Sequence, residues 1–391
     1  MKHRIVILGA GYAGTIAAGR LARRLHDDDV EITLVNAEPD FVERVRMHQL
    51  ATGQHLRDRP LRELLAGTGV TLRVARVTSV DVDTRSIALD DGSDLGYDTL
   101  VYALGSARDD HGVRGVFEHA HEVASRPGAL RLRQRLHALA PGSRVVVVGG
   151  GLTGIEAASE IAESFEHLDV AIAVRGSFGD WLSPSGQRHL RGTFDRLGVT
   201  VHERTGVSRV DATSVTADDG ATIPADVTVW AAGFAAHPIA ASSGLAVTDR
   251  GQIVVDETMR SVSHPDVYAV GDAALGHTTV GTPLRMSCAS GVPMAWQAAD
   301  SIVARLTGGK LPHTPLTYVH QCISLGRRDG LIQFVTPDDR ARSFAPGGRL
   351  MARYKELICT GAAWAVTHPV PYPTRRRRVA TTTVPVVAAA R

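Results

Sequence analysis

The most constraining feature of this chain is a pattern that occurs twice. RIVILGAGYAGTIAAGRLARR spans residues 4–24, and RVVVVGGGLTGIEAASEIAES spans residues 144–164. In each copy a short β-branched run indicates a buried strand, and apolar residues recur at helical spacing after three glycines. The sequence therefore predicts two strand–turn–helix units, each with a tight glycine turn between its strand and its helix.

The three glycines of such a unit have separate roles. The first permits the turn, the second lets backbone approach a pyrophosphate, and the third lets the helix pack closely on the strand. The pyrophosphate then lies on free N–H groups at the positive end of the helix. The predicted cradle residues are Gly9, Gly11, Tyr12, Ala13 and Gly14 in the first unit and Gly149, Gly151 and Gly154 in the second.

A second strand follows each unit at matching spacing. VEITLVN ends at Asn36, 22 residues after Gly14, and DVAIAVR ends at Arg175, 21 residues after Gly154. The alternative, two glycine turns that bind no ligand, is disfavoured because both copies keep the full spacing. Two dinucleotide folds in one chain indicate two dinucleotides, a hydride carrier and a bound flavin.

The composition excludes several other classes of protein. Of 391 residues, 44% are hydrophobic and 21% charged, which is ordinary for a globular chain of two or three domains. A net charge of +2 creates no field that attracts nucleic acid. The three cysteines form no C-x-x-C motif, which excludes a close-spaced redox dithiol and a zinc ribbon. Glycines interrupt the N-terminal apolar run, so we expect no signal peptide.

Three further segments resemble one enzyme family. HPDVYAVGDAA (residues 264–274) contains Gly271 and Asp272, DTLVYALGS spans 98–106, and DVTVWAAGF spans 226–234. Together with the glycine units, they resemble the FAD- and NAD(P)-dependent pyridine nucleotide oxidoreductases, and within them the branch of type II NADH dehydrogenases and apoptosis-inducing-factor-like proteins. The resemblance covers roughly residues 1–305 and is looser beyond.

This resemblance implies an α/β fold with two Rossmann-like domains and a small C-terminal α+β domain. The expected order is a first FAD-binding segment, an inserted NAD(P)-binding domain, a second FAD-binding segment, and a C-terminal interface domain with a basic tail. The corresponding ranges are 1–108, 109–236, 237–305 and 306–391.

The resemblance also implies roles for single residues. Asp272 is expected to hydrogen-bond the ribityl chain of FAD, and Glu156 to orient the nicotinamide carboxamide. The alternative for Glu156 is a first-turn glutamate favoured only by the helix dipole. Backbone N–H groups at the start of the helix within 286–302 are expected to face the flavin pyrimidine ring. Further expected cofactor contacts are Ala103, Gly105, Gly233, Gly271, Ser287 and Ala289.

Two positions depart from the family pattern at the adenosine ends of the cofactors. Asn36 replaces the usual acid that holds the FAD ribose, and either Asn36 or Glu38 is expected to serve instead. Arg175 replaces an acid typical of NADH-specific members, and arginine can pair with the 2′-phosphate of NADPH. We therefore expect NADPH rather than NADH. The alternative is an arginine that stacks on adenine with little discrimination.

Polar residues also stand where the type II enzymes carry apolar ones. In FVERVRMHQLATG (residues 41–53), Arg44 and His48 lie on one face if the segment is helical. One interpretation is a polar pocket over the flavin that selects a polar acceptor. The other is that these side chains point to solvent or to an FAD phosphate.

The helix expected within residues 286–302 departs from the family as well. Only Gln297 remains of the family's quinone-binding glutamines, and Pro293 is expected to interrupt the helix. These changes weaken the interpretation as a respiratory-quinone enzyme but not the flavin interpretation. Cys288 stands at the helix start, where a thiol pKa would be lowered. We expect a packed residue there, with a redox role as the alternative.

The sequence therefore predicts an FAD-dependent NAD(P)H:acceptor oxidoreductase in which Glu156, His48 and Arg44 act at the flavin. Its small-molecule electron acceptor is expected to be a quinone or a quinone-like compound. The alternatives are a biosynthetic flavin oxidoreductase acting on a polar small molecule and an NAD(P)H-binding redox sensor.

The sequence also predicts the partners, assembly and location of the protein. We expect no metal, no nucleic-acid partner, and a cytoplasmic location that is at most peripheral to the inner face of the membrane. A homodimer is one expected assembly through the C-terminal region. The run Arg375–Arg378 is expected to be a solvated tail, with docking on anionic lipid as the alternative.

Overall fold

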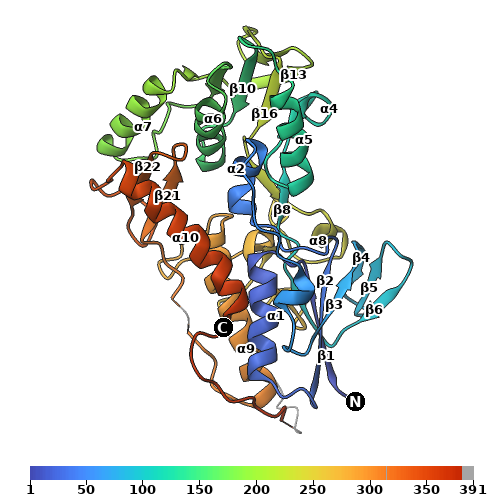
Figure 1. The fold of residues 1–391 in the computed structure, drawn as a ribbon. Coiled ribbons are helices and arrows are strands. Elements are labelled where there is room, and N and C mark those ends of the chain that lie inside the picture. Colours follow the sequence, from blue (N-terminus) through green and yellow to red (C-terminus); the bar gives the residue numbers. More distant parts are fainter. Residues whose placement is uncertain (314, 381–391) are drawn as a thin grey trace.

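Two five-stranded parallel sheets form the centre of the computed structural model, which describes residues 1–313 and 315–380 (Figure 1). The first sheet has the order β19-β7-β1-β2-β3. Residues 5–8 of its central strand are apolar and buried, as in a parallel strand covered on both faces. The strands are β1 (His3–Leu8), β2 (Val30–Asn36), β3 (Val70–Val74), β7 (Thr99–Tyr102) and β19 (Val267–Ala269).

The second sheet repeats this construction with the order β12-β11-β10-β16-β9. Its central strand contains the second apolar run, and residues 145–148 are buried. The strands are β9 (Ala120–His121), β10 (Arg144–Val148), β11 (Asp169–Ala173), β12 (Thr200–His202) and β16 (Val227–Trp230). The two glycine units therefore lie at the centres of two separate sheets, which confirms the predicted α/β fold.

A short antiparallel pair connects the two sheets. Strand β8 (Ser106–Arg108) follows β7, strand β17 (Phe234–Ala236) follows β16, and Arg108 pairs with Phe234. The chain thus leaves the first sheet on β8, builds the second sheet, and returns on β17 before β19 rejoins the first sheet beside β7. We keep the domain ranges 1–108, 109–236, 237–305 and 306–391 as a proposal that agrees with this path.

Helices cover the sheets, and small antiparallel sheets extend from them. The long helices are α1 (Tyr12–Arg24), α5 (Arg126–His137), α6 (Leu152–Ser164), α7 (Pro184–Arg196), α9 (Cys288–Thr307) and α10 (Arg349–Thr367). Shorter helices are η1 (Arg44–Arg46), α2 (Met47–Ala51), α3 (Leu61–Leu64), α4 (Val116–His119), α8 (Ile239–Ser242) and η2 (Gly271–Ala273). The remaining strands are β4 (Val77–Asp81), β5 (Ser86–Leu89), β6 (Asp94–Gly96), β13 (Val207–Asp211), β14 (Ser214–Ala217), β15 (Thr222–Pro224), β18 (Ile253–Val254), β20 (Ala274–Leu275), β21 (His320–Ser324) and β22 (Gly330–Phe334).

Helix α9 continues through Pro293, so the interruption expected there is wrong. Proline removes one backbone hydrogen bond and disfavours the helix interior. Packing outweighs that cost here, because Met294, Ala295 and Ala298 directly after the proline are buried in the core of the first sheet. The helix also packs against α1 along its length.

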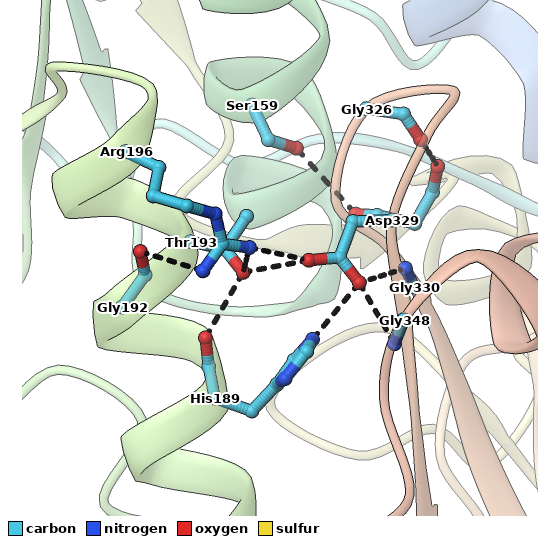
Figure 2. Close-up of polar contacts among 10 residues, drawn as sticks. Ser159, His189, Gly192, Thr193, Arg196, Gly326, Asp329, Gly330 and Gly348 are labelled. Atoms are coloured by element: carbon cyan, nitrogen blue, oxygen red, sulfur yellow. Dashed lines mark hydrogen bonds and ion pairs between the residues drawn. The ribbon is translucent and has the colours of Figure 1, made fainter.

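The C-terminal region joins both sheets. The hairpin β21–β22 contributes Ile323, Leu325 and Leu331 to the core of the second sheet. Helix α10, red in Figure 1, runs from this hairpin to α1 of the first sheet. In the turn of the hairpin, Asp329 accepts hydrogen bonds from side chains of α7 and from two backbone N–H groups (Figure 2). The C-terminal region therefore holds the second sheet against the first.

All four arginines at residues 375–378 are exposed to solvent, as expected of a solvated tail, but two of them form ion pairs with the segment that follows α1. Three consecutive aspartates follow α1 and face this run. The ion pairs are Arg376–Asp27 (2.8 Å), Arg378–Asp28 (3.1 Å) and Arg378–Asp29 (3.0 Å). Backbone bonds from His26 N to Arg377 O and from Arg377 N to Arg24 O fix the run beside α1. In the described part of the chain, no helix has both the length and the apolarity needed to cross a bilayer.

Candidate functional site

The first glycine turn has the geometry of a phosphate cradle. A Cβ atom on Gly9 would lie 2.4 Å from the carbonyl oxygen of Ala103, and one on Gly14 would lie 1.9 Å from that of Gly9. These two positions accept only glycine because backbone fills the space. Gly11 has no atom within 4 Å of an added Cβ. The second glycine therefore faces open space, which is the place where a pyrophosphate would approach.

The second turn repeats the same geometry. An added Cβ would lie 2.5 Å from Ala231 O at Gly149 and 1.9 Å from Gly149 O at Gly154, whereas Gly151 faces open space. In both units the glycine that caps the helix provides no side-chain hydrogen bond. The first N–H groups of α1 and α6 are thus free of side-chain caps and can bind an anion.

The late motif at Gly271 and Asp272 lies against the first cradle. A Cβ on Gly271 would lie 3.2 Å from the Cβ of Ala13, although 258 residues separate the two in sequence. The Asp272 carboxylate accepts hydrogen bonds from Ser106 Oγ (2.7 Å) and from Arg44 Nη1 (3.3 Å). Arg44 Nη2 is buried without a hydrogen-bond partner among the described residues. Open space, free N–H groups and an unpartnered donor fit a bound FAD.

The predicted ribose residues have different surroundings. Asn36 Oδ1 accepts the backbone N–H of Ala10 (2.9 Å), and Asn36 Nδ2 donates to the carbonyl of Glu38 (2.8 Å). Asn36 therefore braces the glycine turn from the end of β2. Glu38 is exposed, so its carboxylate is the more accessible of the two groups.

The other predicted cofactor contacts lie after the strands of the two sheets and at the start of α9. An added Cβ would lie 3.9 Å from Arg44 Nη1 at Gly105 and 2.5 Å from His111 Nε2 at Gly233. Ser287 caps α9 by accepting the N–H of Ser290, and Ala289 lies in the first turn of this helix. Arg175 is exposed two residues after β11. No ion pair to it appears in the described part of the chain, so its guanidinium is accessible to a ligand.

A buried charged cluster lies at the first turns of α6. Glu156 Oε1 accepts hydrogen bonds from Lys355 Nζ (3.0 Å) and from the backbone N–H of Ser324 (3.0 Å). Glu156 Oε2 lies 3.9 Å from His48 Nδ1. Lys355 Nζ also donates to the carbonyl of Cys322 at 3.1 Å. The cluster, which we call the Glu156 cluster (Glu156, Lys355, His48), joins α6, α2 and α10.

Burial and charge set the protonation of this cluster. Burial is the largest single effect and would raise the pKa of Glu156, but Lys355, His48 and the Ser324 N–H together lower the pKa overall. Burial would lower the pKa of Lys355, and Glu156 raises it overall. Burial lowers the pKa of His48 to about 4. At neutral pH the cluster therefore holds a carboxylate, an ammonium and a neutral imidazole.

The Glu156 cluster faces the start of α9. Lys355, Asp272 and Glu156 all act on the pKa of the Cys288 thiol in the first turn of this helix. Burial is the largest effect and raises that pKa, so the lowering expected from the helix dipole is wrong. Cys288 is thus a packed thiol close to the Glu156 cluster and to Asp272.

Arg44 and His48 do not share the face of one helix. The segment forms the single 3₁₀ turn η1 followed by the short helix α2. Arg44 points to Asp272 and stacks over Phe234, with 4.8 Å from its guanidinium carbon to the ring centroid, whereas His48 points to Glu156. Neither side chain is fully exposed, and both lie at the inferred cofactor region.

Sequence reasoning missed Lys355 and Ser324, which hold Glu156. They lie more than 160 residues after Glu156, and no local pattern connects them. One signal was available. The chain has only three lysines, Lys2, Lys310 and Lys355, because arginine supplies nearly all its positive charge. A lysine on the largely apolar helix α10 suits a buried site, since its compact ammonium needs less space than a guanidinium.

Comparisons with known proteins agree with this geometry. The family model described as pyridine nucleotide-disulphide oxidoreductase matches residues 3–301. An NADH dehydrogenase-like protein of Mycobacterium tuberculosis is 31% identical over 321 residues, 77% of this chain and 80% of that protein. A demethylphylloquinone reductase of Synechocystis is 28% identical over 349 residues, 85% of this chain and 86% of that protein.

The fold is also similar to that of a solved structure. The sulfide:quinone oxidoreductase of Aquifex aeolicus superposes with a TM-score of 0.81 at 19% identity, covering 95% of this chain and 93% of that one. The predicted recognition is therefore confirmed at the level of the family. This chain belongs to the pyridine nucleotide-disulphide oxidoreductases, a family that binds FAD and NAD(P)H.

Proposed function

We propose that the protein is an FAD-dependent NAD(P)H:acceptor oxidoreductase that prefers NADPH and reduces a quinone or quinone-like small molecule. One observation carries this proposal. Two phosphate cradles of the same construction, each with an open second glycine, stand in two parallel sheets joined by β8 and β17. One such cradle fits a tightly held flavin, and the other fits a transient hydride donor.

The chain supplies the binding groups for both cofactors. The cradle at Gly11 and the Asp272 carboxylate would hold FAD, which when bound relays two electrons from the nicotinamide to the acceptor. The cradle at Gly151 would hold the pyrophosphate of NAD(P)H, and Arg175 would meet a 2′-phosphate. Glu156 is proposed to orient the nicotinamide from the first turns of α6.

The Glu156 cluster supports a proton-coupled acceptor. A quinone takes up two protons with its two electrons, and hydride transfer supplies only one of them. The cluster holds a proton on Lys355 Nζ and contains a neutral imidazole at His48, so it can donate and accept protons in a water-poor site. The quinone reductase named among the relatives agrees with this class of acceptor.

Gln297 does not contribute to this acceptor proposal. Its side-chain nitrogen donates to the carbonyl oxygens of Glu257 and Pro312, both at 3.1 Å, and the residue is buried. It therefore connects α9 to neighbouring loops. The Glu156 cluster and Arg44 remain the polar groups from which acceptor selectivity would arise.

A spectrum and a titration test the proposal. The purified protein should show flavin absorption, and anaerobic NADPH should bleach it at lower concentration than NADH. Steady-state oxidation of NADPH should then be fast with menadione and slow with oxygen. A colourless protein that cannot be reconstituted with FAD, or a flavin that neither coenzyme reduces, would contradict the proposal.

A further inference from the structure

Three glutamates lie along one face of α6. Glu156, Glu160 and Glu163 are spaced by four and then three residues, so their side chains follow one another along the helix. The end of β21 and the loop after it cover both ends of this row. Ser324 N donates to Glu156 Oε1, and Arg327 N donates to Glu163 Oε2. The row runs from the buried cluster to Glu163, which is partly exposed.

Glu160, the middle glutamate of the row, is a fully buried carboxyl group without a cationic partner in the described part of the chain. Gln54 Nε2 donates to its Oε1, while Oε2 is buried without a hydrogen-bond partner. A buried carboxylate in this setting is costly, and the protonated acid avoids that cost.

The charges around Glu160 place its titration near neutrality. Burial is the largest effect and raises the pKa of Glu160 to about 7. The Arg327 charge and the Gln54 hydrogen bond lower it, whereas Glu163 and Glu156 raise it further. From α2, the neutral His48 faces the Glu156 end of the row. Glu160 can therefore gain and lose a proton under working conditions.

The proposed reaction requires a proton from water. NAD(P)H provides two electrons and one proton, and a quinone needs two electrons and two protons to become a quinol. We infer that the row Glu163–Glu160–Glu156 carries the missing proton from solvent to the Glu156 cluster, with Glu160 as its protonated middle member. Glu160 gives its proton toward Glu156 and regains one through Glu163, so the protein is unchanged after each turnover. This inference rests on the proposed function.

A second entrance exists but is less suited to protons. A cavity of about 170 Å³ between the loop after β21 and α10 is lined by Lys355 and by Glu356. Arg327 and Arg353 also line it. A hydronium ion that entered there would meet the repulsion of three cationic side chains. Arg327 and Lys355 also lie beside the glutamate row, but the carboxyl groups of the row can each bind a proton, whereas the cationic side chains of the cavity cannot.

The substitution Glu160→Gln tests the inference because it keeps the shape of the side chain but cannot carry a proton. In the holoenzyme at pH 7.5, we expect the rate with menadione to fall by about tenfold or more. The rate with ferricyanide should stay within about twofold, since ferricyanide takes electrons and needs no delivered proton. Glu166→Gln, an exposed residue just beyond α6, is the matched control and should change neither rate.

Two further readouts separate a proton carrier from a structural residue. The menadione rate of the wild type should show an inflection near pH 7 that Glu160→Gln lacks and Glu160→Asp retains. The second readout is stability. The folded pKa of Glu160 lies above its unfolded value, so the wild type should lose stability between pH 5 and pH 8. The denaturation midpoint of Glu160→Gln should fall less over the same range.

Each contrary outcome has a distinct meaning. Unchanged menadione rates in Glu160→Gln would assign proton entry to the cavity beside Lys355 and overturn the inference. Equal losses with menadione and ferricyanide would show a structural role and overturn it too. A wild-type enzyme that reduces ferricyanide but not menadione would overturn the proposed acceptor, and the relay with it, before any variant is made.

Discussion

Among single residues, Lys355 determines whether Glu156 can remain charged inside the protein. Its ammonium lies 3.0 Å from the carboxylate, and the two side chains are 15% and 10% exposed. Lys355→Met removes this cation and leaves a buried carboxylate with one backbone donor. Breaking such a pair costs about 3–5 kcal/mol of unfolding free energy. Chemical denaturation at pH 7 measures this loss.

The pH dependence of that loss follows from the pKa of Glu156. In the wild type this pKa is lowered, so the stabilisation is present at neutral pH and is lost only as the pH falls through the folded value. Without Lys355, burial raises the pKa, and the variant should be less stable at pH 8 than at pH 5. The double variant Lys355→Met/Glu156→Gln should recover stability, because no buried charge remains. No recovery would show that Lys355 acts mainly through packing.

Arg175 is the residue that we expect to select the coenzyme. It is exposed, and a charge-assisted bond to a 2′-phosphate contributes about 1.5–3 kcal/mol. Arg175→Glu should therefore shift the ratio of kcat/KM for NADPH over NADH toward NADH by about ten- to a hundredfold. Arg188→Glu, an exposed arginine on α7, makes the same charge change and should leave the ratio unaltered. An unshifted ratio in Arg175→Glu would favour simple stacking on adenine.

Among the elements, the contact between α7 and the β21–β22 hairpin depends on Asp329 (Figure 2). Its carboxylate accepts bonds from His189 Nε2 (2.9 Å), Thr193 Oγ1 (2.9 Å) and Arg196 Nη2 (2.8 Å). Asp329→Asn keeps the size but removes the charge and turns one acceptor into a donor. We expect a cost of about 1–3 kcal/mol and faster hydrogen exchange in the hairpin. Asp249→Asn, at an exposed loop position, should change neither quantity.

The pKa of Asp329 predicts how acid affects the contact between α7 and the hairpin. Burial would raise the pKa of Asp329, but hydrogen bonds from His189 and Thr193 lower it to about 2. Its contribution is therefore complete above about pH 4 and is lost as the pH falls toward 2. The protection factors for hydrogen exchange in the hairpin should fall over that range in the wild type and not in Asp329→Asn. Identical acid profiles would show that another group controls the contact.

Elements close in sequence were predictable, whereas contacts between distant elements were not. The glycine turns follow from residues within one strand, one turn and one helix, so local spacing suffices to predict them. Helix α9 passes through Pro293 because the core packs its next turns, and the partners of Glu156 come from β21 and α10. Such outcomes depend on tertiary packing, which no short window of sequence contains.

Across the whole molecule, the two sheets and the C-terminal region meet at the Glu156 cluster. Its members come from α2 before the first sheet is complete, from α6 of the second sheet and from α10. Residues 47, 50 and 51 of α2 are buried in the same core as α6, so His48 and Glu156 are held together by the second sheet's core, and α10 brings Lys355 to them. The C-terminal segment of the described chain also returns to the first sheet's domain, because Arg377 forms backbone hydrogen bonds with residues 24 and 26 at the end of α1.

The contact between the C-terminal segment and the end of α1 determines whether the basic run at residues 375–378 can bind a membrane surface. Arg376 and Arg378 are paired with Asp27, Asp28 and Asp29, so their charge is locally compensated. The triple variant Asp27→Asn/Asp28→Asn/Asp29→Asn should free both arginines and raise partitioning to phosphatidylserine vesicles by roughly an order of magnitude at low salt. Neutralising the exposed acids Asp83, Asp94 and Asp219 gives the same net charge and should have a much smaller effect. If both triple variants bind vesicles equally, net charge alone explains the attraction, and the pairing does not mask a lipid-binding run.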